Sequence, residues 1–202
     1  MNEQKESNLE TIIFSFIWSF KKGDNILYNL NILNELYDSK RRSTNNKKLF
    51  YNKPIILILA AIIECILEDF IWRIKEHTHE KIPNLSENVV RDFKYIDKEG
   101  HIEIRELKKF YHFIDQLEKH KIFGDLVWIY RAMNLVRKLR NRLHIQNSHD
   151  DLGKNESSVF TESNLEITER LLELIIRKMA YVHPRNGMVP AIDPGTINFP
   201  WK

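Results

Sequence analysis

The sequence predicts an all-α protein, a helical bundle of about five to seven helices with an irregular C-terminal tail. Apolar residues recur every three or four positions in several long segments, which is the spacing of one helix face. Only six glycines and six prolines interrupt the 202 residues, and this favours long helices over many turns. With 43% hydrophobic residues the chain can bury a sizeable core, so residues 1–183 are expected to form a single helical domain.

Two helices are expected at the N-terminal end. Ser7 and Glu10 form a capping-box pattern, which predicts a helix over 11–20. Gly23 suits the residue that ends such a helix, because glycine readily adopts the left-handed conformation common there. A second helix with a regular apolar stripe is then expected over 24–37.

Residues 39–53 form a polar connection that is rich in cations. One interpretation is a flexible basic arm whose charges meet the phosphates of RNA. The alternative is a solvated loop with no partner. The candidate RNA-binding residues in this segment are Lys40, Arg41, Arg42, Lys47 and Lys48.

A central helix is expected from Pro54 to about His77. Proline is tolerated in the first turn of a helix. The run Ile55–Ile63 is apolar on every side, as expected for a helix buried all round. Glu64 and Glu68 lie one turn apart and could pair with basic groups of a later helix, as structural ion pairs rather than as acid–base catalysts.

Residues 95–106 match part of the calcium-binding loop pattern, but Tyr95 occupies the position where a carboxylate should bind the metal. The segment is therefore interpreted as a turn before a helix over 104–119. Gly124 follows as a break in the helical pattern, and Asp125 is expected to cap the next helix.

The C-terminal part should contain one more strong helix after an exposed loop over 146–158. Residues 184–202 hold four of the six prolines and are expected to form an irregular tail, with Phe199 and Trp201 docking it onto the body. His183 is interpreted as a surface residue just before this tail.

Composition sets few limits on function. The net charge of +3 neither demands nor excludes nucleic acid. Cys65 is the single cysteine and cannot form an internal disulfide, and no P-loop, dinucleotide-binding or zinc-binding motif is present. The N-terminal residues do not resemble a signal peptide, and the apolar run Ile55–Ile63 is too short to span a bilayer. A cytoplasmic protein without membrane contact, cofactor or metal is therefore expected.

The segment Tyr130–His144 has neither glycine nor proline, and its apolar spacing is helical. At about 100° per residue, five polar side chains fall within roughly 40° of one line along this helix. They are Tyr130, Asn134, Arg137, Asn141 and His144. The opposite side is apolar and is expected to pack; it holds Ala132, Leu135, Leu139 and Leu143. Arg140 precedes His144 by one turn and could join the polar line from its edge.

This polar line contains the groups that RNA cleavage without a metal needs. An imidazole can accept or donate a proton near neutral pH. A guanidinium can hold a phosphate with two hydrogen bonds and stabilise charge that builds on its oxygens. An amide can orient either group. The alternative is a solvated basic helix whose histidine interacts with the helix C-terminus.

The stretch Leu139-Arg140-Asn141-Arg142-Leu143-His144 resembles the signature of the HEPN superfamily, in which four to six residues separate a His from an earlier Arg that is often followed by Asn or another polar residue. Here Arg140 supplies the Arg–Asn pair with three residues before His144, whereas Arg137 has a gap of six and is followed by lysine. The resemblance implies a HEPN-like helical bundle. It also implies a metal-independent endoribonuclease that acts as a homodimer, in many members as a toxin or in antiphage defence.

The roles that follow from the resemblance are specific. His144 would act as general base or acid, Arg140 (or alternatively Arg137) would stabilise the charge on the phosphate, and Asn141 would orient the pair. The supporting residues are Arg137, Asn134 and Tyr130, and Arg142 joins the RNA-binding set. The expected partners are RNA, a second copy of the chain and an antitoxin or regulatory protein. A non-catalytic HEPN-like module that binds RNA or protein is the alternative, and a purely structural helical protein is the third.

Overall fold

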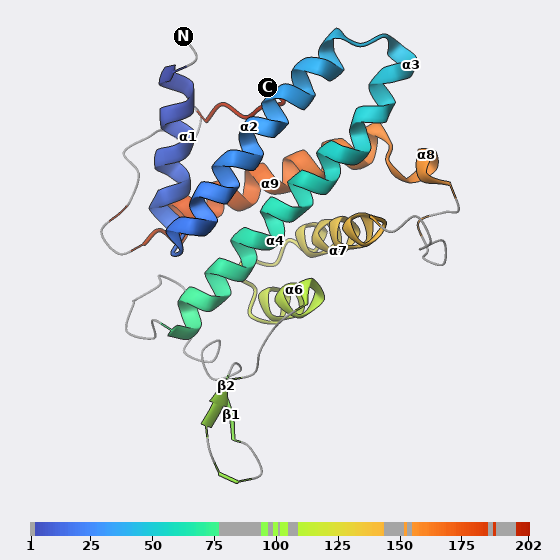
Figure 1. Cartoon of the computed structure of the whole chain (residues 1–202). Coiled ribbons are helices and arrows are strands. Elements are labelled where there is room, and N and C mark those ends of the chain that lie inside the picture. The colour runs from blue at the N-terminus through green and yellow to red at the C-terminus, as the bar shows by residue number, and fades with distance from the viewer. Residues whose placement is uncertain are drawn as a thin grey trace.

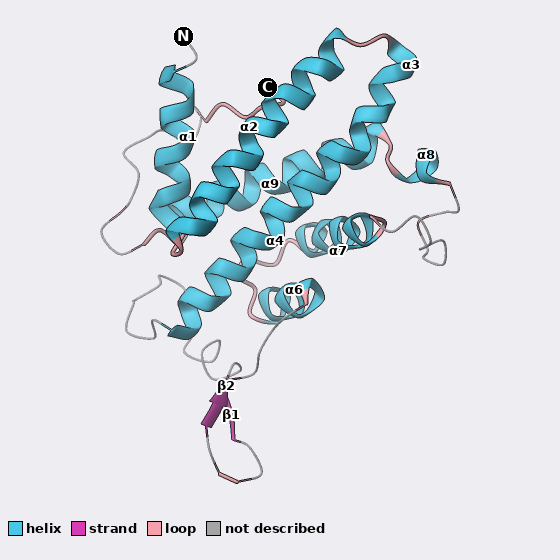
Figure 2. Ribbon diagram, viewed as in Figure 1, coloured by secondary structure: helices cyan, strands magenta, loops and turns pink. Residues whose placement is uncertain are grey.

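The computed structural model describes residues 3–76, 94–96, 99–100, 102–104, 109–143, 152, 155–185, 188 and 197–202. These residues form a helical bundle (Figures 1 and 2), which confirms the predicted all-α class. The helices are α1 (Glu3–Phe16), α2 (Phe20–Arg42), α3 (Asn45–Lys48), α4 (Asn52–Glu76), α6 (Phe110–Lys119), α7 (Val127–Asn141), α8 (Glu156–Val159) and α9 (Glu162–Val182), with a 3-10 turn η1 (Leu49–Tyr51) before α4.

Helix α4 is the centre of the bundle and packs against α2, α6, α7 and α9. Its first half carries the apolar run Ile55–Ile63, and most of these side chains are buried. They share one apolar core with residues from α1, α2, α6, α7 and α9. The predicted central helix is therefore correct in position and in its end, which the structure places at Glu76. None of the described helices combines the length and the apolar character that crossing a bilayer requires.

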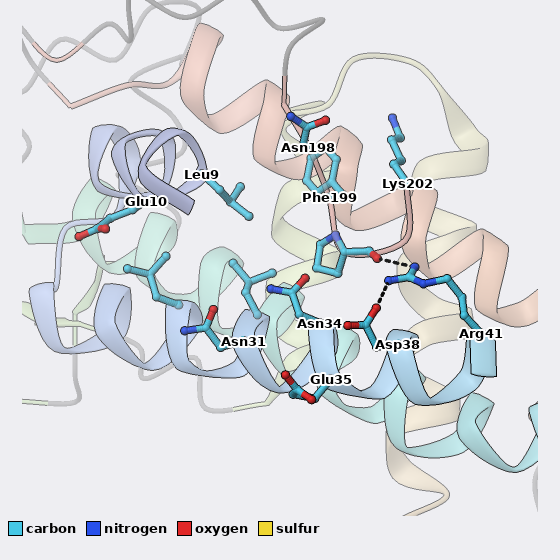
Figure 3. Close-up of a pocket in the computed structure, with 13 residues that line it drawn as sticks. Leu9, Glu10, Asn31, Asn34, Glu35, Asp38, Arg41, Asn198, Phe199 and Lys202 are labelled. Atoms are coloured by element: carbon cyan, nitrogen blue, oxygen red, sulfur yellow. Dashed lines mark hydrogen bonds and ion pairs between the residues drawn. The ribbon is translucent and has the colours of Figure 1, made fainter. Parts of the chain in front are cut away.

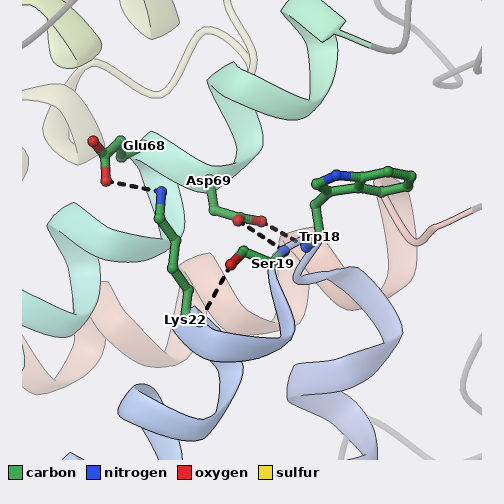
Figure 4. A network of polar contacts seen from close by, with 5 residues as sticks. All are labelled: Trp18, Ser19, Lys22, Glu68 and Asp69. Carbon is green, nitrogen blue, oxygen red and sulfur yellow. Dashed lines mark hydrogen bonds and ion pairs between the residues drawn. The ribbon is translucent and has the colours of Figure 1, made fainter.

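The break between the first two helices lies at residues 17–19, and the sequence-based boundary at Gly23 is wrong. A carboxylate from α4 creates this break: Asp69 accepts hydrogen bonds from the backbone N–H groups of Trp18 and Ser19 at 2.7 and 3.1 Å. Ser19 caps α2 and accepts from the backbone of Lys22 (Figure 4). The free N–H groups at the start of α2 are thus satisfied by a residue 50 positions away, which local patterns do not contain.

Gly23 lies inside α2 and serves close packing instead of helix termination. A Cβ atom at this position would stand 2.4 Å from Cε1 of Phe14 on α1. The glycine therefore lets the Phe14 ring lie directly against the α2 backbone.

The predicted flexible connection over 39–53 is almost entirely helical. Helix α2 continues to Arg42, and α3 and η1 lead directly into α4, so only Ser43 and Thr44 lie outside a helix. Ser43 is itself hydrogen-bonded through its hydroxyl to the carbonyl of Ser39 at 2.8 Å. The interpretation as a flexible arm is wrong, because helices hold both ends of the segment.

Two boundaries in the middle of the chain also differ from prediction. Residues Lys94–Ile96 (β1) and Ile102–Ile104 (β2) form a short antiparallel pair in which Lys94 pairs with Ile104, so α6 begins at Phe110 and not at 104. Asp125 does not cap α7; it forms an ion pair with Lys121 at 2.7 Å, and no side chain caps the helix. Of the rest of the interpreted calcium-like loop, residues 99–100 form a turn, and residues 97–98, 101 and 105–106 lie outside the described residues.

In the C-terminal part the predicted last helix is present, whereas residues 156–158, predicted to belong to an exposed loop, lie in the short helix α8; residues 146–151 and 153–154 of that loop lie outside the described residues. Thr161 caps α9 by accepting a hydrogen bond from the backbone of Asn164 at 3.2 Å. The last six residues lie against α2 and α9, where Phe199 is buried and stacks on Trp201. Arg41 of α2 donates to the carbonyl of Pro200 at 3.2 Å.

His183, interpreted from sequence as a surface residue, is buried at the end of α9. Its carbonyl accepts a hydrogen bond from Arg73 of α4 at 2.8 Å, and the same guanidinium donates to the carbonyl of Phe16 at 2.7 Å. Burial, together with the nearby cations Lys178 and Arg73, lowers the pKa of the His183 imidazole to about 4. The interpretation failed because this burial depends on a helix more than 100 residues away.

We expect this buried imidazole to make the protein less stable in mild acid. The unfolded chain binds a proton at its ordinary pKa of 6.5, whereas the folded chain does so only near 4. The free energy of unfolding should therefore fall as the pH decreases from 6.5 towards 4, by up to about 3 kcal/mol from this group. Urea unfolding across this range should show a flatter pH dependence for His183→Leu; an unchanged slope would contradict the assignment.

Candidate functional site

The site predicted on α7 is built on a helix whose buried side is wider than expected. Helices α4, α6 and α9 all pack against α7, and they bury Ile129, Met133, Val136 and Leu139. They also cover Tyr130, whose hydroxyl accepts from the backbone of Phe123 and donates to the carbonyl of Gly124, at 3.1 and 3.0 Å. Tyr130 thus fixes the turn before α7 and is not part of an open polar face, contrary to its predicted supporting role.

Asn134 and Arg137 are brought together as the predicted line requires. Asn134 donates to the carbonyl of Tyr130 at 3.2 Å, and its amide oxygen accepts from Nε of Arg137 at 3.3 Å. Within the described part of the chain, no further hydrogen bond or ion pair engages the terminal amino groups of Arg137. The guanidinium is therefore oriented through one edge, and its other edge can receive an oxyanion.

Arg140 lies on the exposed side of α7 but is already paired with a carboxylate. Its Nη2 stands 3.2 Å from Glu64 of α4. Burial raises the pKa of Glu64, and Glu68 adds to the effect while Arg140 opposes it. The expected ion pair between α4 and this helix is confirmed for Glu64, whereas Glu68 pairs with Lys22 instead (Figure 4).

The end of α7 only partly matches the prediction. Asn141 is exposed. Arg142 is buried, with 3% of its surface accessible, and Leu143 is exposed, so these two have the opposite environments from those expected. Both follow the last helical residue, where the helical wheel no longer applies. His144 lies outside the described residues.

The cations predicted to bind RNA on residues 40–48 fall into two groups. Lys40 is buried and pairs with Glu162 of α9 at 2.6 Å, so its assignment as a phosphate-binding group is wrong. Arg41 pairs with Asp38 at 2.6 Å and also contacts the C-terminal segment. Three others have no ion pair and no side-chain hydrogen bond to any described residue: Arg42, Lys47 and Lys48.

A cavity of about 430 Å³ lies between α1, α2 and the C-terminal segment. Glu10, Glu35 and Asp38 line it together with Asn side chains, and Arg41 is held there by Asp38 and Pro200 (Figure 3). Its carboxylates would repel phosphate, so the cavity does not extend the predicted site.

A second cavity, of about 520 Å³, opens between the start of α7 and α9 and is lined largely by apolar side chains, among them Leu126 and Leu174. Arg137 and Arg140 do not line it.

Metal and thiol chemistry have little support in the part of the chain that the structure describes. No group of three or more His, Cys, Asp or Glu side chains is placed there to hold a metal ion. Burial raises the pKa of the Cys65 thiol to about 11, so it stays protonated and is a poor nucleophile.

The chain matches no protein-family model, no curated protein and no solved structure.

Proposed function

We propose that the protein is a HEPN-like, metal-independent endoribonuclease. The observation that supports this most directly is the Asn134–Arg137 pair, which orients a guanidinium whose terminal amino groups contact no described polar group, with six residues between Arg137 and His144. Such an activity would suit a cytoplasmic toxin or antiphage defence protein, restrained by an antitoxin or another regulatory protein.

In the proposed reaction the ribose 2'-hydroxyl attacks the adjacent phosphate. His144 takes the proton from the 2'-oxygen as this oxygen bonds to phosphorus. The bond from phosphorus to the 5'-oxygen of the next nucleotide breaks, and a protonated His144 of the second copy gives that oxygen a proton, leaving a cyclic phosphate and a 5'-hydroxyl. The guanidinium of Arg137 meets the charge that builds on the phosphate oxygens, and Asn141 orients the phosphate or the imidazole. This chemistry needs no metal.

The ion pair between Arg140 and Glu64 favours a second candidate, a non-catalytic HEPN-like module that binds RNA. If Arg140 is the arginine of the motif, its positive charge is already neutralised by Glu64 and is less able to stabilise charge on the phosphate. Incubation of the purified protein with mixed RNA and a chelator separates the two: cleavage supports the enzyme, and salt-sensitive binding without cleavage supports the module.

We expect His144→Ala to abolish cleavage while the helical content and the melting temperature stay nearly unchanged, because only the proton transfer is lost. His149→Ala is the matched control, since it removes another imidazole five residues further along the chain. Gel analysis of RNA products and thermal melts measure both effects. Full activity of the His144 variant would remove this residue from the mechanism.

Substituting Arg137 should reduce the cleavage rate more than substituting Arg140, although the Arg140–Asn141 dipeptide suggests the opposite. Because Glu64 neutralises Arg140, we expect Arg137→Ala to slow cleavage about a hundredfold, roughly 3 kcal/mol, and Arg140→Ala to slow it less. Single-turnover rates measure this. Arg131→Ala is the control, an exposed arginine about 120° around the same helix. Small and equal effects at Arg137 and Arg140 would dispose of the site.

We also propose a homodimer in which two copies of α7 face one cleft, since His144 of one chain supplies only one acid–base group. Charge repulsion is moderated because Arg142 is buried and Arg140 is paired. Leu143, 59% exposed at the end of α7, should contribute apolar contact. Light scattering at tens of micromolar should give a dimer, and Leu143→Asp a monomer without cleavage. Leu126→Asp, at the other end of the helix, should remain dimeric; an active monomer would refute the proposal.

A further inference from the structure

The corner where α2 turns into α3 and η1 carries three unpaired cations beside an exposed aromatic ring. We call Arg42, Lys47, Lys48 and Phe50 the basic corner. The other cations of this segment have structural partners: Lys40 pairs with Glu162, and Lys53 pairs with Glu156 at 2.6 Å. The structure therefore separates the cations that hold the fold from those that remain available to a ligand.

No acidic residue occurs between Asp38 and Glu64 in the sequence. Of the carboxylates that reach this region, Asp38 is paired with Arg41, and Glu156 and Glu162 are paired with lysines. The charge of the basic corner is thus not neutralised by the acids that contact its flanks, and it favours an anionic ligand.

Phe50 is 78% exposed, the largest exposed fraction among the large apolar side chains of the described residues. The chain from α3 through η1 follows a continuous helical path, so Lys47 and Phe50, three residues apart, lie on the same side. An aromatic face beside a cation is the arrangement that binds a nucleotide, because the ring stacks on the base while the cation meets the phosphate.

The basic corner is held firmly at both ends. Asn52, at the start of α4, is buried and donates to the carbonyl of Phe160 at 3.1 Å. The ion pairs of Lys40 and Lys53 attach the flanking helices to α9 and α8. Phe50 is therefore presented on an ordered helical turn, and binding would not require this segment to fold first.

We propose that the basic corner binds a single-stranded segment of RNA, with Phe50 stacked on one base and Arg42, Lys47 and Lys48 contacting the phosphates. The inference rests on the proposed function only in taking RNA as the ligand. It adds a contact that lies outside α7 and selects single strands, because the bases of a duplex are already stacked on one another.

An anionic membrane surface is a less suitable ligand for the same charges. Helices that lie in a membrane interface bury a long apolar face, whereas α3 has four residues and the corner exposes only Leu49 and Phe50 as large apolar side chains among those described.

The test is the affinity of a labelled oligouridylate and of its duplex, measured by fluorescence anisotropy in the His144→Ala background at several salt concentrations. Phe50→Ala should weaken single-strand binding roughly tenfold, leave the salt dependence unchanged and reduce the preference over duplex. Phe50→Trp should bind like the parent. The triple variant Arg42→Gln, Lys47→Gln and Lys48→Gln should reduce the slope of log K against log salt by about 2.

Tyr28→Ala is the matched control, because Tyr28 is 68% exposed on α2 among amide and acidic neighbours and should have no effect. Unchanged RNA affinity of Phe50→Ala would overturn the inference, as would Phe50-dependent binding to phosphatidylserine vesicles without RNA binding. Cleavage assays keep the two proposals apart. If RNA binding depends on Phe50 but the unsubstituted chain does not cleave RNA, the basic corner is supported and the proposed enzyme activity is contradicted. If the chain cleaves RNA and Phe50→Ala changes neither binding nor cleavage, the enzyme is supported and the basic corner is contradicted.

Discussion

The buried guanidinium of Arg73, on α4, connects the C-terminal ends of α1 and α9. From α4 it donates to the last turn of α1 and to the residue that ends α9, and it is almost fully enclosed. One turn earlier on α4, Asp69 holds the start of α2 through two backbone N–H groups. Burial raises the pKa of Asp69, while its hydrogen bonds and the charges of Lys22 and Arg73 oppose this effect. Each of these buried charges is held by backbone groups, Arg73 by two carbonyls and Asp69 by two N–H groups. The positions of α1, α2 and α9 around α4 depend on this arrangement.

The sequence was sufficient for the helices whose signals are local. The apolar run of α4 and the long helix α9 near the C-terminus appear where the pattern predicts them. It failed wherever a distant side chain decides the outcome. Asp69 moves the first break away from Gly23, and Glu162 draws Lys40 into the bundle. Arg73 encloses the end of α9 at His183. Each of these partners lies far away in the sequence, so a pattern of neighbouring residues cannot predict the contact.

For the candidate site, the sequence indicated which polar residues lie on α7 more reliably than it indicated which of them are buried or exposed. A helical wheel assumes one buried line, but three helices cover α7, and Tyr130, in the middle of the predicted polar line, becomes part of the core. The wheel also extended past Asn141, so it assigned Arg142 and Leu143 to the wrong surfaces. Asn134 and Arg137 do lie on one face as the helical spacing predicts, since residues three apart on a helix are neighbours wherever the rest of the chain lies. Which cation remains available to an anion depended on carboxylates elsewhere, chiefly Glu64.

The contact between Gly23 and Phe14 links two positions that would otherwise vary independently. Glycine within a helix costs about 1 kcal/mol relative to alanine, so a chain free to improve α2 alone would replace it. Here a Cβ atom would push against the Phe14 ring, which also packs on Phe20. Position 23 should accept a larger residue only in sequences where position 14 carries a smaller one. Positions 14 and 23 are therefore expected to covary. A substitution of Gly23 that stabilises α2 should require a smaller residue at position 14 of α1 first.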